Sequence, residues 1–446
     1  MSATRPDPTP DAARPPALRP HPSKLFVEVT TRCNLHCSMC VKEAPGQRIL
    51  EGDMSRETFA RLTPALPRLD ALILNGIGEP LMNPHLDRFI EEAKREMPAA
   101  GWVGFQTNGQ LLCPKRAHSL AEAGVDRICI SADAVSPDLF SELRRGGQQE
   151  KIEAAAAALH EAGRQRGRPI SLGVEFVAMR DNLRQLPEIV RWAARNRFSF
   201  VIVTHMLAYH EELAGAAAFG PLTDRSLQVH REWRDRAAAD GVDLSRYFQV
   251  FLKRKYGRID PADQRVIEYV SQMITDAAKQ DVWLKGERLL ESDDALLRRV
   301  EEAFAEAQEI ARREGIDLRL PAAAPTRARR CDFVEDGGSF VSWDGDLHAC
   351  YFLWHRYSCH VGGVVKHVKP LSFGNLADGD VLAIWNSAAS RAFRESVLRY
   401  DYPFCYDCNV ALCDYAQEEE FTQDCHVNTV PCGSCLWSTG VFQCLR

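Results

Sequence analysis

The sequence lacks any run of apolar residues long enough to cross a membrane, and it lacks an apolar N-terminal stretch of signal-peptide type. It also lacks an excess of basic residues, because 55 Lys and Arg stand against 61 Asp and Glu, for a formal net charge of −6. We therefore expect a cytoplasmic protein without a membrane partner. The negative net charge argues against a protein that binds nucleic acid through overall positive charge, but it does not exclude a local basic groove.

Cysteine is scarce in most of the chain and dense at its end. Residues 1–330 hold five of the 15 cysteines, and residues 331–446 hold the other ten. In a reducing cytoplasm, clustered cysteines are more often metal ligands than disulfides. An odd total also fits poorly with complete pairing.

Composition divides the chain into four parts. Residues 1–22 contain seven prolines and few apolar residues, which predicts a disordered leader. Residues 23–204 alternate short apolar runs with helical patterns, and residues 205–315 are charged and helical. Residues 316–446 start with a possible strand at Ile316–Leu320 and continue as a cysteine-rich domain dominated by turns.

The alternation in residues 23–204 predicts an α/β fold. Six apolar runs and five intervening helices indicate a parallel sheet with crossover helices. Six strands are too few for a closed eight-stranded barrel, so we predict a partial (βα)6 barrel whose working face lies at the C-terminal ends of the strands. The predicted strands are Leu25–Thr30, Ala71–Asn75, Trp102–Thr107, Arg127–Ser131, Ser171–Val177 and Phe200–Thr204. The predicted helices are Ser55–Leu66, Leu86–Met97, Pro114–Ala123, Lys151–Ala162 and Leu183–Asn196, with Asp294–Glu314 in the helical insert.

Three closely spaced cysteines follow the first predicted strand. Cys33, Cys37 and Cys40 have the spacing Cys-x3-Cys-x2-Cys, and three thiolates on one tight loop can hold three irons of a 4Fe–4S cluster. One iron then keeps an open position for a chelating ligand. The alternatives are structural cysteines and a zinc site. A zinc site needs a fourth ligand, which His36 could supply, although it lies between two of the cysteines and would crowd the loop.

This loop resembles the hallmark of the radical SAM superfamily. The resemblance implies that the open iron binds S-adenosylmethionine (SAM) and that one-electron reduction of SAM gives a 5′-deoxyadenosyl radical. The position before the third cysteine, usually aromatic in that family, is Met39 here.

Further segments at predicted strand ends resemble SAM-contacting motifs of the family. Gly76, Gly78 and Glu79 form a Gly-x-Gly-Glu-Pro variant of its Gly-Gly-Glu motif. Thr107 and Asn108 belong to a Thr-Asn-Gly segment, Ser131 opens Ser-Ala-Asp, and Glu175 is a carboxylate within an apolar strand. The resemblance implies cofactor contacts for the first six of these residues, with ordinary turns and helix caps as the alternative. Strand alternation places Glu175 on a face that could point into the cavity and contact SAM or substrate, with a solvent-facing or paired Glu175 as the alternative.

The cysteine-rich tail resembles the SPASM extension of radical SAM enzymes, which binds auxiliary iron–sulfur clusters. Cys331, Gly345 and Cys350 fit the first part of its pattern, and Cys405, Cys408 and Cys413 fit the second, with Cys413 one residue early. The resemblance implies one cluster on Cys405, Cys408 and Cys413 and another on Cys331 and Cys350. Cys425, Cys432, Cys435 and Cys444 are predicted metal ligands outside the usual spacing. Zinc ribbons are the alternative for the tail.

The resemblance implies a radical SAM enzyme that modifies a peptide or protein and receives electrons from a partner such as ferredoxin or flavodoxin. The closing segment from Cys432 to Cys444 resembles a subgroup that matures metalloenzymes of the tungsten aldehyde oxidoreductase type. A radical SAM enzyme acting on a small molecule is one alternative. The alternative from another class is a non-catalytic iron–sulfur electron carrier or metal chaperone, which has no use for an open iron.

Overall fold

A single curved sheet organises the protein. The computed structural model describes residues 14–282, 284, 294–405, 408, 413 and 418–446. Its main sheet has ten strands, of which eight neighbours in the order β10-β1-β3-β4-β5-β7-β8-β9 are parallel. These strands are β1 Lys24–Val27, β3 Ala71–Ile73, β4 Trp102–Thr107, β5 Arg127–Ser131, β7 Ser171–Ala178, β8 Phe200–His205, β9 Asp317–Arg319 and β10 Gly338–Val341. Antiparallel strands β11 (Asp346–His348) and β14 (Ser372–Asn375) extend the β10 edge.

The predicted α/β architecture with a parallel sheet is confirmed, and all six predicted core strands are present. The sheet is wider than six strands because β9 adds to one edge and β10 to the other. Both come from residues after the helical insert, and β9 lies within the run predicted as Ile316–Leu320. The sheet stays open, since β9 and β14 are its two ends.

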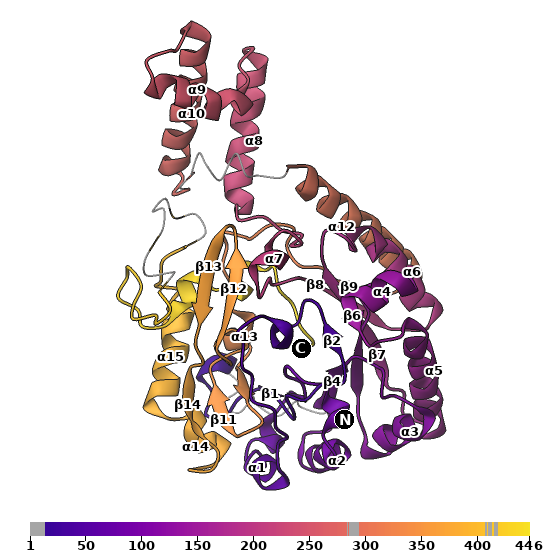
Figure 1. Cartoon of the computed structure of the whole chain (residues 1–446). Coiled ribbons are helices and arrows are strands. Elements are labelled where there is room, and N and C mark those ends of the chain that lie inside the picture. Colours follow the sequence, from indigo (N-terminus) through magenta and orange to yellow (C-terminus); the bar gives the residue numbers. More distant parts are fainter. Residues whose placement is uncertain (1–13, 283, 285–293, 406–407, 409–412, 414–417) are drawn as a thin grey trace, which may run out of the picture.

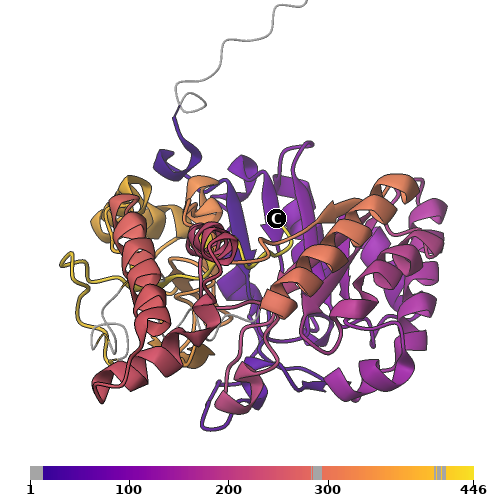
Figure 2. The same ribbon diagram turned by 90° about the horizontal axis from the view of Figure 1, so that it is seen from above.

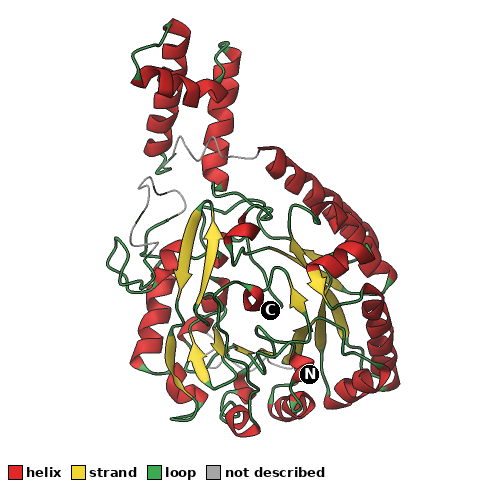
Figure 3. Cartoon of the chain, in the orientation of Figure 1, coloured by secondary structure: helices red, strands yellow, loops and turns green. Residues whose placement is uncertain are grey.

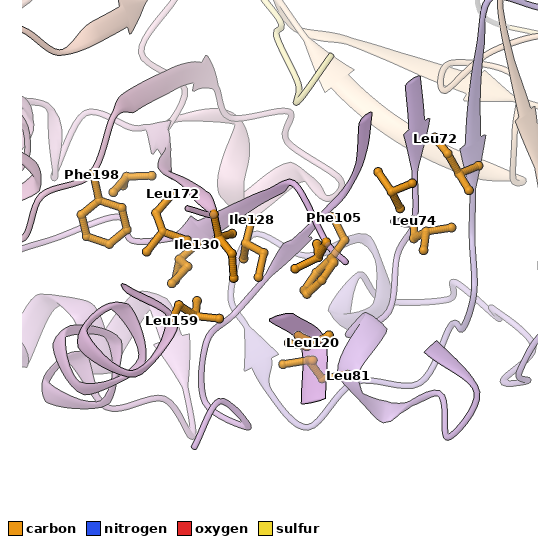
Figure 4. Close-up of a cluster of buried hydrophobic side chains, with 14 of the residues drawn as sticks. Leu72, Leu74, Leu81, Phe105, Leu120, Ile128, Ile130, Leu159, Leu172 and Phe198 are labelled. Carbon is orange, nitrogen blue, oxygen red and sulfur yellow. The ribbon is translucent and has the colours of Figure 1, made fainter. Parts of the chain in front are cut away.

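Helices cover the outside of the curve, and strands line its inside (Figure 3). Side chains alternate across each strand, so Ile128 and Ile130 pack under the helices (Figure 4) while Cys129 points to the interior side. Helix α3 shows how these helices are bounded: Pro114 opens it, and Gly124 closes it with a left-handed φ of 91°. The helices of this layer are α1 Arg56–Ala60, α2 Leu86–Glu96, α3 Pro114–Ala123, α4 Pro137–Leu143, α5 Gln149–Gln165 and α6 Leu186–Arg195.

The C-terminal segment lies inside the curve of the sheet (Figures 1 and 2). The Val441 carbonyl accepts a hydrogen bond from the His205 amide at 3.3 Å, and the Gln443 amide donates to Thr204 Oγ1 at 3.1 Å. Leu445 is fully buried in an interior apolar layer with Phe26 and Phe340. The tail thus fills the interior of an open barrel.

The leader is partly ordered, which differs from the predicted disorder of residues 1–22. Residues 1–13 lie outside the described residues. Pro16–Leu18 form a short 3-10 helix with Ala17 fully buried, and the Ala17 carbonyl accepts a hydrogen bond from the buried Arg394 guanidinium at 2.7 Å. The prediction overlooked these partners because they lie almost 400 residues away in sequence.

The helical insert contains two different structures. α8 (Asp224–Ala239), α9 (Tyr247–Lys255) and α10 (Pro261–Lys279) form an arm with its own apolar core, which projects from the barrel (Figure 1). In contrast, α12 (Asp294–Glu314) packs against α6 and belongs to the outer layer of the barrel. The short α7 (Glu211–Ala214) precedes the arm. No helix among the described residues is long and apolar enough to span a membrane.

In the part of the cysteine-rich region that the structure describes, a hairpin and the α-helices α13 to α15 are added to the β10 side of the sheet. The hairpin consists of β12 (Tyr357–Val361) and β13 (Val364–Val368), which pair antiparallel. The helices are α13 (Asp332–Glu335), α14 (Val381–Trp385) and α15 (Ala388–Arg399). Because β10 pairs with β1, this part shares one sheet with the N-terminal barrel.

Replacing Leu445 with alanine should lower the free energy of unfolding by about 2–5 kcal/mol, since the change leaves a cavity in the interior layer. Leu50 is 77% exposed, and Leu50→Ala is the control, expected to change stability by less than about 0.5 kcal/mol. Anaerobic guanidinium unfolding followed by circular dichroism measures both. A Leu445→Ala change as small as the control would contradict packing of the tail inside the barrel.

Candidate active site

Cys33, Cys37 and Cys40 lie together on the loop after β1, as predicted, and all three line one cavity of about 340 Å³. A two-strand pairing between β2 (His36–Cys37) and β6 (Arg144–Arg145) fixes the middle of this loop, and the Ser38 amide donates to the Leu143 carbonyl at 3.0 Å. Burial raises the pKa of Cys40 to about 11 and also raises the pKa values of Cys33 and Cys37. Metal binding requires thiolates, and burial opposes their formation in this loop.

Arg144 is a buried residue of this site that sequence reasoning missed. Its Nε lies 2.7 Å from Asp133 Oδ2, and its Nη1 donates to Cys37 Sγ at 3.9 Å. The guanidinium favours the thiolate form of Cys37, opposing the effect of burial on the pKa. A buried arginine 107 residues from its cysteine leaves no local pattern in the sequence.

Glu79 is buried and holds two loops together. Its Oε1 accepts hydrogen bonds from Thr107 Oγ1 at 2.7 Å and from the Leu81 amide at 3.2 Å, and its Oε2 accepts from the Asn108 amide at 2.7 Å. Burial is the main effect on this group and raises its pKa. Asn108 also donates to Asn34 Oδ1 at 2.9 Å and to Cys33 Sγ at 3.9 Å. The predicted residues Glu79, Thr107 and Asn108 therefore form one hydrogen-bonded unit beside the cysteine loop.

Gly76 and Gly78 are needed for a close approach of two loops. A Cβ on Gly76 would lie 2.3 Å from Glu28 Cγ, and one on Gly78 would lie 2.4 Å from the Thr30 carbonyl oxygen. Glu28 is fully buried there; its Oε1 accepts from the Ile77 amide at 3.0 Å, and His355 Nε2 lies 3.1 Å from its carboxylate. The two glycines thus line the cavity while packing against the loop that carries the cysteines.

Ser131 and Glu175 are neighbours in register on β5 and β7, and both line the cavity. Burial raises the pKa of Glu175 to about 7, against the opposing effects of a hydrogen bond from Gln106 and the nearby Arg144. Gln106 Oε1 accepts from Asn75 Nδ2 at 2.6 Å, and Asn75 Oδ1 accepts from the Tyr351 hydroxyl at 2.9 Å. A row of polar side chains thus crosses the cavity wall from Glu175 to Tyr351, a link that no local motif signals.

Nine of the ten tail cysteines separate into two sets of four and one outlier; the tenth, Cys359, is fully buried in β12. Cys331, Cys350, Cys432 and Cys435 lie close enough to act electrostatically on one another, and burial raises the pKa of Cys350 to about 12. The members of a second set also act electrostatically on one another; they are Cys405, Cys408, Cys413 and Cys425. Cys444 belongs to neither set and lines the cavity of Cys33, Cys37 and Cys40.

The two sets are joined by short contacts. The Cys405 amide donates to the Gly433 carbonyl at 3.1 Å, and the Lys366 ammonium donates to the Ser434 carbonyl. The charge of Lys366 lies near Cys405 of one set and Cys435 of the other. Among the described residues, no group of three or more His, Cys, Asp or Glu side chains is spaced to hold a single metal ion. A 4Fe–4S cluster is a larger group that offers a separate iron to each thiolate.

Comparison with known proteins gives two family matches. Residues 27–193 match the model described as the radical SAM superfamily, and residues 331–409 match the SPASM model, described as an iron–sulfur cluster-binding domain.

Individual relatives match over different lengths. The chain is 27% identical over 428 residues to the tungsten-containing aldehyde ferredoxin oxidoreductase cofactor-modifying protein of Pyrococcus furiosus, which covers 94% of this chain and 96% of that protein. It is 36% identical over 127 residues to GTP 3',8-cyclase of Pelotomaculum thermopropionicum, covering 28% of this chain and 38% of the relative.

Solved structures are similar at low identity. SuiB of Streptococcus suis bound to S-adenosylmethionine has a TM-score of 0.49 and 14% identity over 87% of this chain and 71% of SuiB. Native anSMEcpe with bound AdoMet has a TM-score of 0.48 and 13% identity over 83% of this chain and 82% of that one.

Stability should fall as the pH rises through the range in which Glu175 ionises. The pKa of Glu175 is raised from 4.5 in the unfolded chain to about 7 in the folded state. The stability that the protonated carboxyl contributes is therefore fully present below the unfolded-state pKa, and it is lost as the pH rises towards the folded-state pKa. Glu175→Gln should flatten this dependence, whereas Glu302→Gln, at an exposed position of α12, should not. Urea unfolding between about pH 5 and pH 8 measures the effect. Parallel curves for wild type and Glu175→Gln would contradict it.

Proposed function

Because this chain belongs to the radical SAM superfamily and carries a C-terminal SPASM domain, we propose that it modifies a peptide or protein substrate during the maturation of a metalloenzyme cofactor. The chain is a radical SAM enzyme, and its cofactors are SAM and 4Fe–4S clusters. The substrate assignment is the part that needs a test.

One observation carries the maturation proposal. Similarity to the cofactor-modifying protein of Pyrococcus furiosus extends over 94% of this chain, so it includes the arm and the cysteine-rich tail as well as the barrel. That protein is named for modifying the cofactor of an aldehyde ferredoxin oxidoreductase. We infer that the substrate here is of a related class, the polypeptide of an oxidoreductase that carries or will receive such a cofactor.

The cysteine loop has the donor set that the cofactor needs. We propose that Cys33, Cys37 and Cys40 hold the SAM-binding cluster, which when reduced supplies the 5′-deoxyadenosyl radical from SAM. Arg144 favours the thiolate of Cys37, and Asn108 donates to Cys33. Three of about four acceptor positions on the Glu79 carboxylate are filled by protein donors. We therefore assign Glu79 mainly to fixing the loop and leave one acceptor position for a ligand.

For the auxiliary clusters, we propose two sets of four cysteines. One comprises Cys331, Cys350, Cys432 and Cys435; the other comprises Cys405, Cys408, Cys413 and Cys425. Mutual electrostatic effects within each set support this division. In this proposal, each cluster has four cysteine ligands, including those that the sequence pattern did not identify. Cys444, which the sequence predicted as a metal ligand, is not one of them.

Anaerobically reconstituted wild-type protein should bind about twelve irons, and Cys33→Ala/Cys37→Ala/Cys40→Ala should bind about eight. With dithionite and SAM, only the wild type should form 5′-deoxyadenosine. Cys444→Ala is the matched control and should keep about twelve irons, because we propose that it is not a ligand. Zinc in place of iron, or no SAM cleavage by the wild type, would move the protein to the electron-carrier or metal-chaperone class.

A small-molecule substrate is the second candidate, and the size of the cavity favours it. About 340 Å³ lies at the small end of ligand pockets. No residue of the arm lines this cavity. A separate cavity of about 170 Å³, which shares Met206 with it, is lined by Leu227 of α8 and by residues before and after the arm. A peptide therefore has a surface next to the site, but only a small group can enter it.

Mass spectrometry can separate the two candidates. A tungsten-containing aldehyde oxidoreductase would be incubated with the active enzyme, SAM and reduced ferredoxin or flavodoxin. The Cys33→Ala/Cys37→Ala/Cys40→Ala enzyme is the control. We expect a mass change in the oxidoreductase polypeptide that depends on the active enzyme. A change confined to the extracted cofactor would favour the small-molecule candidate, and no change in either would contradict the maturation proposal.

A further inference from the structure

Cys444 lines the cavity of the three loop cysteines, although it comes from the end of the cysteine-rich tail. The adjacent Gln443 fixes its position, because its amide donates to Thr204 Oγ1 at 3.1 Å and its side chain donates to the Leu320 carbonyl at 2.5 Å. On the other side, Leu445 is fully buried, and Arg446 forms an ion pair with Asp332. The thiol is therefore held in the interior by both of its neighbours.

The surroundings of Cys444 are those of a protonated thiol. Burial and the carboxylate of Glu175 raise its pKa to about 12. The groups with the largest electrostatic effects on it are Glu175, Arg446, Lys24 and Asp332, and none of these belongs to a four-cysteine set. Burial raises the pKa of Cys350 and Cys405 to about the same value, so its place on the cavity wall, not its pKa, sets Cys444 apart from the proposed cluster ligands.

The cavity wall also offers an unused polar group near this thiol. Ser131 is 9% exposed, lines the same cavity, and its hydroxyl makes no hydrogen bond to any described residue. Glu175, its neighbour in register, is the residue with the largest electrostatic effect on Cys444 after burial itself. A ligand that fills the cavity therefore meets a free hydroxyl, a carboxyl group and a thiol.

We propose that Cys444 is a catalytic hydrogen-atom donor to carbon radicals formed in this cavity. This inference rests on the proposed radical chemistry. The S–H bond of Cys444 breaks homolytically, its hydrogen atom forms a C–H bond with the radical, and a thiyl radical remains on Sγ. One electron from a low-potential donor of the ferredoxin or flavodoxin class, and one proton from the Glu175 carboxyl group, restore the thiol.

Glu175 lines the cavity and recovers its proton from water that enters there. Its hydrogen bond to Gln106, which continues through Asn75 to the Tyr351 hydroxyl, holds the carboxyl in position. Cys129 is the other thiol near Glu175, but it is fully buried in the apolar layer and does not line the cavity. Access to the cavity thus distinguishes Cys444 from Cys129.

The experiment uses the full chain, reconstituted anaerobically, with SAM and dithionite in D2O and no added substrate. In D2O the Cys444 thiol carries deuterium, and the 5′-deoxyadenosyl radical is itself a carbon radical in the cavity. Wild-type protein should place one solvent-derived deuterium in most of the 5′-deoxyadenosine. Cys444→Ser keeps the side-chain size but offers a stronger O–H bond, and it should lower the deuterated fraction at least fivefold. Mass spectrometry reports this fraction independently of the total amount formed.

Two controls make the result specific. Cys129→Ser tests the other interior thiol, and Cys113→Ser tests an exposed thiol at the start of α3; both should retain the wild-type deuterated fraction. Iron content checks that each variant is folded and loaded. Unlabelled product from the wild type, full labelling in Cys444→Ser, or loss of label in Cys129→Ser would each overturn the assignment. Absence of 5′-deoxyadenosine from every sample would overturn the proposed function and this inference with it.

Discussion

The parallel pairing of β1 with β3 on one side and β10 on the other is the constraint on which the structure depends. β1 is short, but it carries the Cys33–Cys40 loop at its C-terminal end and joins the two halves of the chain in one sheet. Because Lys24 pairs with Gly338, the cysteine-rich part is fixed to the strand that positions the cysteine loop. The contact between His355 and Glu28 lies directly beyond this strand and extends the same connection into the site.

Burial dominates the electrostatics of the cavity. Burial raises the pKa values of the loop cysteines, Glu79 and Glu175. A side chain that is charged in this cavity therefore needs a partner of opposite charge or a hydrogen-bond donor. Arg144 with Asp133 is one such pair, since each charge compensates the other next to Cys37. The same low-polarity surroundings that make thiolates costly also strengthen hydrogen bonds to Glu79. An interior of this kind protects a radical from water and keeps a thiol such as Cys444 protonated.

Local patterns predicted most of the barrel from the sequence. Trp102–Thr107, Arg127–Ser131, Pro114–Ala123 and Asp294–Glu314 have the bounds that apolar periodicity and capping residues indicate. The Cys33–Cys40 loop and the Thr107–Asn108 segment were found because their residues are adjacent in sequence. Arg144, Tyr351 and the buried Ala17 were missed because their contacts join distant segments. The interior position of Cys444 was missed for a related reason. The spacing of cysteines along the sequence does not show on which side of a sheet each one lies.

β1 and β10 pair although they lie far apart in the sequence, and this separation affects how the protein folds in the cell. Lys24 and Gly338 are separated by 338 − 24 = 314 residues, so a very long loop must close before this part of the sheet gains any pairing energy. Until then β1 is an edge strand, and the cysteines of both halves are accessible to oxidants. Metal bound to the proposed ligands Cys331, which precedes β10, and Cys350, which follows β11, together with Cys432 and Cys435 of the tail, would stabilise the closed form only. With the proposed ligand sets, folding and cluster loading would be one linked equilibrium, in which iron and sulfide supplied during synthesis favour the folded protein.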